Sequence, residues 1–156
     1  MENSKGTAPI NRDDAQTQLD SLAGDRAWSG ARAAAPWWLI VLHGVSVAGW
    51  TLSFGLGNWQ AMGFVVSALA FVGLGLIRPW ITRNHAEPWA TSRRAGVPGI
   101  IQILIAAVII AVGVIAYDRL GVEWALWPAA ILAGSTTVFF GMRMERALSR
   151  DVAEGN

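Results

Sequence analysis

One histidine lies inside the long stretches of this sequence that carry no charge, and it is the first candidate for chemistry. His43 lies seven residues beyond Pro36, and Gln102 lies four residues beyond Pro98. If both prolines begin helices that enter a membrane, His43 reaches a depth of about 10 Å and Gln102 lies shallower on the same side. A histidine there could ligate a haem or bind a quinone, and the plainer interpretation is a hydrogen bond to a neighbouring helix. We predict one intramembrane polar cluster, formed by His43, Gln102, Ser135, Thr136 and Thr137.

The rest of the sequence offers no recognisable catalytic motif. The chain has no cysteine, which excludes disulfides, thiolate metal sites and a cysteine nucleophile. It has no HExxH, GxSxG, P-loop or strand-associated GxGxxG pattern. The charge-free stretches also lack the carboxylates and arginines on which ion-coupled transporters and voltage sensors depend. We therefore expect no enzyme activity, no cofactor, no metal site and no autonomous coupled transport.

Three charge-free stretches define the elements that would position the polar cluster. Residues 33–77, 95–117 and 124–142 contain no Asp, Glu, Lys or Arg, although charged residues make up 15% of the chain. About 18 such residues are enough for a helix to cross the hydrocarbon core of a membrane. The first stretch has room for two helices, joined by a tight turn at Gly55-Leu56-Gly57-Asn58. The sequence predicts an all-α membrane protein with four transmembrane helices in two antiparallel hairpins, at about 36–54, 59–77, 97–117 and 124–142.

The arginines beside these predicted spans are distributed unevenly between the two sides of the membrane. Only Arg119 falls on one side, and nine arginines fall on the side that holds both chain ends and the long loop. Arginine and lysine in short loops collect on the cytoplasmic side, so we expect both termini in the cytoplasm. Tryptophans at the predicted helix ends fit an interfacial aromatic belt. The nine arginines are Arg26, Arg32, Arg78, Arg83, Arg93, Arg94, Arg143, Arg146 and Arg150.

Polar segments flank the predicted transmembrane domain, which covers residues 36–143. Residues 1–35 are polar, so no cleaved signal peptide is expected there, and they form a cytoplasmic N-terminal segment. Residues 144–156 form a cytoplasmic C-terminal tail. Within the N-terminal segment, apolar residues recur at helical spacing and predict a short amphipathic juxtamembrane helix, with a partly ordered polar tail as the alternative. These residues are Ala15, Leu19, Leu22, Ala23 and Ala27.

Small residues follow one face of the last predicted helix. Ala130, Gly134, Thr137 and Gly141 recur at intervals of four, three and four residues. Small side chains at this spacing let helix backbones approach closely in a membrane. We expect this face to pack within the chain, and a homo-oligomer interface is the alternative.

The loop between the second and third predicted spans mixes tryptophan with arginine. Such a composition is typical of a segment that lies on an anionic membrane surface. It also suits the docking of a protein partner, and the simplest interpretation is a connector that obeys the positive-inside rule. The residues of this predicted interfacial loop are Arg78, Trp80, Arg83, Trp89, Arg93 and Arg94.

Residues 20–38 carry a resemblance to a known class of proteins. The segment begins Asp20-Ser21-Leu22-Ala23-Gly24-Asp25-Arg26 and reaches Ala33-Ala34-Ala35-Pro36-Trp37-Trp38. It resembles small four-span membrane proteins that are widespread in high-GC Gram-positive bacteria, in which an acidic-basic leader runs into a Pro-Trp-Trp entry. Many of them continue with Tyr-His-Pro, where this chain has Leu39-Ile40-Val41. The resemblance implies a multi-pass protein of the bacterial cytoplasmic membrane and brings no activity with it.

Three classes of function fit these expectations. A non-catalytic membrane subunit or scaffold is favoured, because the spans carry no charge and the loop and tails offer contact surfaces. A channel or transporter component would need a homo-oligomer to build a path. A haem or quinone binder would use His43, because His85 in the loop has no spacing that pairs it with His43. The expected partners are the lipid bilayer and a protein at the cytoplasmic loop, and a net charge of +1 argues against nucleic acid.

Overall fold

The computed structural model describes residues 15–22, 24, 34–82 and 93–154, and all regular secondary structure in these ranges is helical. Three long helices are apolar enough to cross a membrane, and a shorter apolar helix precedes them. The predicted all-helical class is therefore confirmed for the described residues, and three of the helices have the length and composition of membrane spans. The shorter helix is α2 (Trp37–Ser53), and the long helices are α3 (Gln60–Thr82), α5 (Arg93–Leu120) and α6 (Leu126–Glu154).

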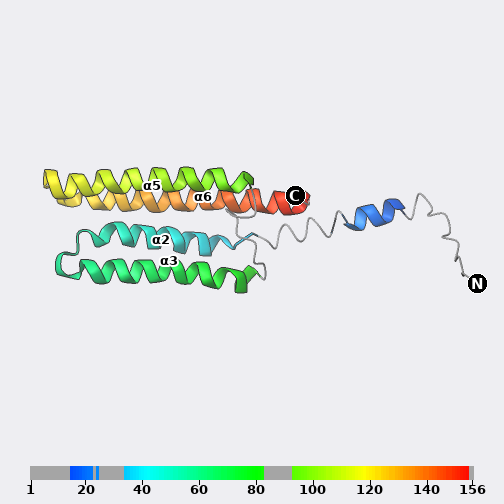
Figure 1. Ribbon diagram of the computed structural model, residues 1–156, viewed down its shortest axis with the longest axis horizontal. Helices are drawn as coiled ribbons and strands as arrows, with labels where there is room; N and C mark the ends of the chain where they lie inside the picture. Colours follow the sequence, from blue (N-terminus) through cyan, green and yellow to red (C-terminus); the bar gives the residue numbers. More distant parts are fainter. Residues whose placement is uncertain (1–14, 23, 25–33, 83–92, 155–156) are drawn as a thin grey trace, which may run out of the picture.

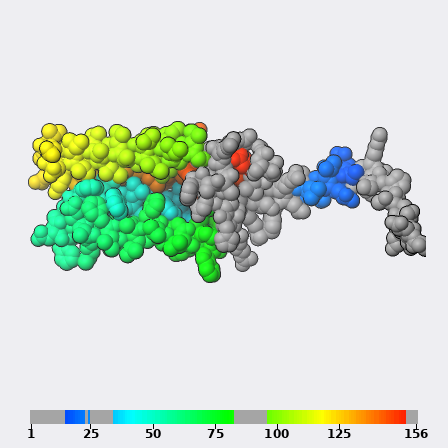
Figure 2. Space-filling view, in the orientation of Figure 1, coloured from blue at the N-terminus to red at the C-terminus, as the bar shows by residue number. Residues whose placement is uncertain are grey.

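The four helices pack in the order α3, α2, α6, α5. Figure 1 shows α2 beside α3 and α5 beside α6, and the main contact between these pairs joins α2 to α6. The outer helices α3 and α5 therefore each rest mainly on one neighbour. Figure 2 shows a hollow between α3 and α5, with atoms of α2 and α6 visible at its floor. This hollow is the groove in which the candidate site lies.

Two glycines let α2 and α6 approach backbone to backbone. A methyl group added at Gly44 would lie 2.8 Å from the carbonyl oxygen of Gly134, and one added at Gly134 would lie 2.8 Å from that of Gly44. Further along α6, a methyl group at Gly141 would lie 2.7 Å from Cγ2 of Ile40 on α2. These contacts hold the centre of the bundle, because no larger side chain fits between the two helices.

Short 3-10 turns connect the helices at the end of the bundle away from the end of α6. The turn η1 (Gly57–Trp59) joins α2 to α3, and η2 (Glu123–Ala125) precedes α6. Gly57 and Gly121 have positive φ values of 53° and 68°, a conformation that glycine adopts without steric cost. After α5 ends, the amide of Val122 donates to the carbonyl of Ala116 at 3.0 Å and satisfies one of the terminal carbonyls.

Three helices extend further than the predicted spans. Helix α3 continues through Pro79 to Thr82, and the hydroxyl of Thr82 donates to the carbonyl of Arg78. Helix α5 begins before Pro98, which removes only one backbone hydrogen bond near the helix start. Helix α6 continues beyond residue 142 to Glu154, and Leu148 in this extension is buried, with only 1% of it exposed. The proposed C-terminal tail is thus largely helical.

The predicted juxtamembrane helix is described only in part. Residues 15–22 are helical, and Leu19 and Leu22 are exposed. Ala23 and Ala27 lie outside the described residues.

Candidate functional site

A buried ion pair joins α3 to α6 at the end of the bundle where α6 ends. The guanidinium of Arg78 donates to Glu145 Oε1 from Nε at 3.2 Å and from Nη2 at 3.0 Å, and Nη2 also reaches Oε2 at 3.1 Å. The two side chains are only 8% and 11% exposed. The backbone N–H of Ala35, just before α2, donates to Glu145 Oε2 at 2.9 Å. One carboxylate therefore ties together three segments of the chain.

The position of Arg78 corrects the sequence interpretation. The sequence predicts Arg78 on the interfacial loop, whereas its side chain points inward and is buried against Glu145. Arginine tolerates this environment because its planar donors match both carboxylate oxygens and offset much of the cost of leaving water. Glu145 follows the last predicted span by only three residues and becomes part of the bundle because α6 continues.

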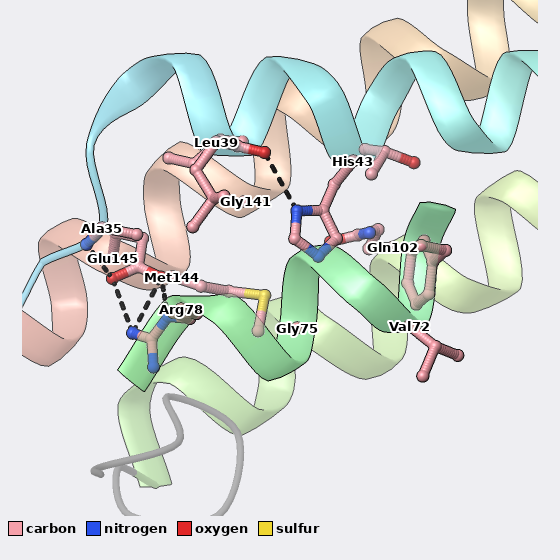
Figure 3. A pocket seen from close by; sticks show the side chains of 13 residues that line it. Ala35, Leu39, His43, Val72, Gly75, Arg78, Gln102, Gly141, Met144 and Glu145 are labelled. Carbon is pink, nitrogen blue, oxygen red and sulfur yellow. Dashed lines mark hydrogen bonds and ion pairs between the residues drawn. The ribbon is translucent and has the colours of Figure 1, made fainter. Parts of the chain in front are cut away.

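Beside this ion pair lies a cavity of about 310 Å³, which we call the His43 cavity. All four helices contribute to it, and Figure 3 shows the side chains that surround it. Its walls are largely apolar, and its polar groups come from a few convergent side chains. The polar lining residues are His43, Arg78, Gln102, Thr137 and Glu145, with Met144 among the apolar ones.

The orientation of the His43 ring follows from its own helix. Nδ1 lies 2.9 Å from the carbonyl oxygen of Leu39, one turn earlier in α2. A carbonyl oxygen only accepts, so Nδ1 carries the hydrogen and donates it. In the neutral ring, Nε2 is then a hydrogen-bond acceptor. The ring also meets the ring of Phe71 edge to face, with centroids 5.1 Å apart and an angle of 81°.

The predicted polar cluster is divided by the structure. His43, Gln102 and Thr137 line the same cavity, whereas Ser135 lines a different hollow, between α2 and α6. Thr136 lines neither of them. The hydroxyl of Thr137 donates to the carbonyl of Ala133 at 2.9 Å, so it is already satisfied within α6.

His43 and Gln102 do not form a hydrogen bond with each other. Among the described residues, the single hydrogen bond of His43 is the one to Leu39, and no hydrogen bond is formed by the side chain of Gln102. Two polar groups with remaining hydrogen-bonding capacity thus share one apolar cavity. Unsatisfied polar groups in an apolar surrounding are costly, so such groups mark where a ligand can gain affinity.

A second hollow of about 370 Å³ continues the cavity along the groove between α3 and α5. The two spaces share Phe71 and Val72, and the second is otherwise lined by apolar and small side chains. The hydroxyl of Ser46, which lines it, donates to the carbonyl of Leu42 at 2.9 Å. The site therefore has a polar head at the ion-pair end and an apolar extension. The other residues of this extension are Val47, Trp50, Ser67, Ala68 and Ile110.

Among the packing-face and loop residues whose side chains the structure describes, Arg78, Thr137 and Gly141 line this cavity and the others do not. Ala130 and Gly134 are buried on α6, while Thr137 and Gly141 border both the α6 core and the cavity. Trp80 is 85% exposed at the end of α3. Arg83 and Trp89 lie outside the described residues, and so do the side chains of Arg93 and Arg94, which begin α5.

Within residues 15–22, 34–82 and 93–154, no group of three or more His, Cys, Asp or Glu side chains is arranged to hold a metal ion. Comparison of the chain with protein-family models, curated proteins and solved structures found no match.

Proposed function

We propose that this chain is a multi-pass protein of the bacterial cytoplasmic membrane, with four spans and both termini in the cytoplasm. Helix α2 has 17 residues, which at 1.5 Å each extend about 26 Å and reach the lower limit for a span. It is held between α3 and α6, which are both long enough to cross. The orientation is supported by the sequence, which has nine arginines on the predicted cytoplasmic side and one on the other side.

The function we propose is that of a non-catalytic membrane subunit or scaffold that contacts a partner within the bilayer through α3 and α5. The observation that carries this proposal is how little of these two helices the chain itself covers. Only 6% of the most apolar stretch of α3 and 17% of that of α5 are buried, against 39% for α6. A partner helix would supply the second neighbour that each outer helix lacks.

Two exposed apolar stripes on the outer helices are the surfaces we assign to that contact. Val65, Leu69 and Leu76 are exposed on α3, and Leu104, Val108 and Ile115 are exposed on α5. Both stripes have intervals of four and seven residues, so each follows one face of its helix. None of the six lines the His43 cavity or its apolar extension. The exposed Trp80 adds a place for a soluble partner on the cytoplasmic side.

Site-specific photocrosslinking in the native membrane tests this proposal. A photoreactive amino acid at Leu69 or Val108 is expected to give a discrete adduct with a different membrane protein, identified by mass spectrometry. The matched controls are Val45 and Ile131, which are similarly exposed but line the other hollow, between α2 and α6. Adducts only with lipid would contradict the proposal. Adducts only with a second copy would also contradict it, and would favour the oligomeric channel or transporter component instead.

A further inference from the structure

The His43 cavity is polar at one end and apolar at the other, and the proposed partner contacts involve neither end. The polar end contains Nε2 of His43, the side-chain amide of Gln102 and the ring of Phe71. The other end is lined by apolar side chains. We propose that this cavity binds one amphipathic molecule of the hydroquinone class, with its hydroxylated ring between His43 and Gln102 and its apolar tail in the groove between α3 and α5. The proposal concerns binding and involves no redox step.

The head of the cavity selects a hydroxyl donor. Because Nδ1 of His43 donates to Leu39, Nε2 is left to accept a hydrogen bond, and a phenolic O–H supplies one. The amide of Gln102 can both donate to and accept from the hydroxyl oxygens. Figure 3 shows the His43 ring and the Gln102 side chain in the same part of the cavity. A ligand without a hydroxyl hydrogen would leave Nε2 unsatisfied, so the site discriminates by hydrogen bonding.

The surroundings of the head suit a flat ring. The Phe71 ring already meets His43 edge to face, and the thioether of Met144 lines the same space. Aromatic rings and methionine sulfur both interact favourably with an aromatic ligand. The cavity volume of about 310 Å³ is at the lower end of the range for small-molecule sites, which accommodates one ring.

The Arg78–Glu145 ion pair forms the wall at the ion-pair end of the cavity. The charge of the Arg78 guanidinium is offset by the Glu145 carboxylate, whose two oxygens accept from Arg78 and Ala35, so the pair offers little net charge to an anionic ligand. The opposite end opens at Phe71 and Val72 into the apolar extension, where the hydroxyl of Ser46 is satisfied by its own helix. A neutral head with an apolar tail therefore matches the site better than a phosphate or a carboxylate does.

Calorimetric titration of the full chain in mild detergent tests the proposal with two matched probes. The probes are decyl-hydroquinone and its dimethyl ether, which has the same ring and tail and no hydroxyl hydrogen. We expect the wild-type protein to bind the hydroquinone about 10-fold more tightly, the effect of one retained hydrogen bond. In His43→Phe, which keeps an aromatic ring and removes the acceptor, the two affinities should become equal. Ser135→Ala, in the other hollow, should keep the 10-fold preference.

Several results would overturn the proposal. If the wild-type protein binds the two probes with equal affinity, the proposal is wrong. This comparison needs no variant, so the test does not depend on whether His43→Phe folds. Retention of the preference in a folded His43→Phe would also overturn the proposal. A haem in the purified protein that is lost in His43→Phe would show that the cavity holds a different ligand. The membrane-subunit proposal rests on the outer faces of α3 and α5 and is unaffected by these outcomes.

Discussion

The carboxylate of Glu145 accepts hydrogen bonds from two guanidinium nitrogens of Arg78, although the two residues are 67 positions apart in the chain. Because the same carboxylate accepts the N–H of Ala35, the pair anchors the start of α2 as well as the ends of α3 and α6. This arrangement closes one end of the bundle beside the His43 cavity.

Removing one partner of this buried ion pair should destabilise the fold strongly. We expect Glu145→Ala to lower the free energy of unfolding by about 3–5 kcal/mol, because the Arg78 charge stays buried without its main counter-charge. Titration with SDS in mixed micelles measures this change. Arg119→Ala is the matched control, since its ion pair with Asp118 is exposed and should contribute little. A loss no larger than that of the control would contradict the role given to the pair.

The double variant Arg78→Met with Glu145→Leu separates burial of charge from loss of contact. Apolar residues of similar volume often replace a buried ion pair at little cost. We therefore expect the double variant to be more stable than Glu145→Ala alone, measured by the same titration. If both variants lose the same stability, the anchoring depends on the charges themselves or on the contact with Ala35.

The close crossing of α2 and α6 predicts opposite outcomes for two glycines. In Gly44→Ala the new methyl group would meet the backbone of Gly134, so we expect a loss of about 1–3 kcal/mol. In Gly73→Ala nothing lies within 4 Å of the new methyl group, and the higher helix propensity of alanine should leave stability unchanged or slightly raised. Thermal denaturation in detergent compares the two. Equal effects would show that the crossing is looser than described.

The extension of α6 beyond the predicted span should contribute to stability through Leu148. This side chain is almost fully buried, so Leu148→Ala should cost about 2–5 kcal/mol. Arg150→Ala, on an exposed position of the same helix, is the control and should change stability little. Unfolding monitored by circular dichroism checks both variants. A neutral Leu148→Ala would mean that the extension does not pack against the bundle.

How much of this structure the sequence predicts depends on which physical constraint shaped each part. Hydrocarbon excludes charge, so residues 33–77, 95–117 and 124–142 reveal the apolar helices by composition alone. The extension of α6 is polar on most positions, and such a segment resembles a solvated tail until its packing is seen. Glu145, Leu148 and Asp151 are buried at intervals of three residues, but two of them are acidic, so apolar periodicity in the sequence does not reveal this buried face.

The site was harder to predict than the helices. The depths of His43 and Gln102 put both on the same side of the membrane, so the sequence predicts them in one cluster. Depth does not specify the face of a helix, so the sequence does not distinguish Ser135 from this cluster, whereas the structure places it in another hollow. The pairing of Arg78 with Glu145 depends on which helices are neighbours, and a single sequence does not show how the helices are arranged.

The account rests above all on four spans with both ends in the cytoplasm, and cysteine accessibility tests this most directly. The chain has no cysteine, so single-cysteine variants need no background changes. With a membrane-impermeant maleimide on intact cells, we predict labelling at Asn58→Cys and Leu120→Cys, and protection of Gly24→Cys and Arg146→Cys until the cells are lysed. Labelling of both Gly24→Cys and Asn58→Cys in intact cells would show that α2 does not cross. Labelling of Gly24→Cys and Arg146→Cys with protection of Asn58→Cys would reverse the orientation.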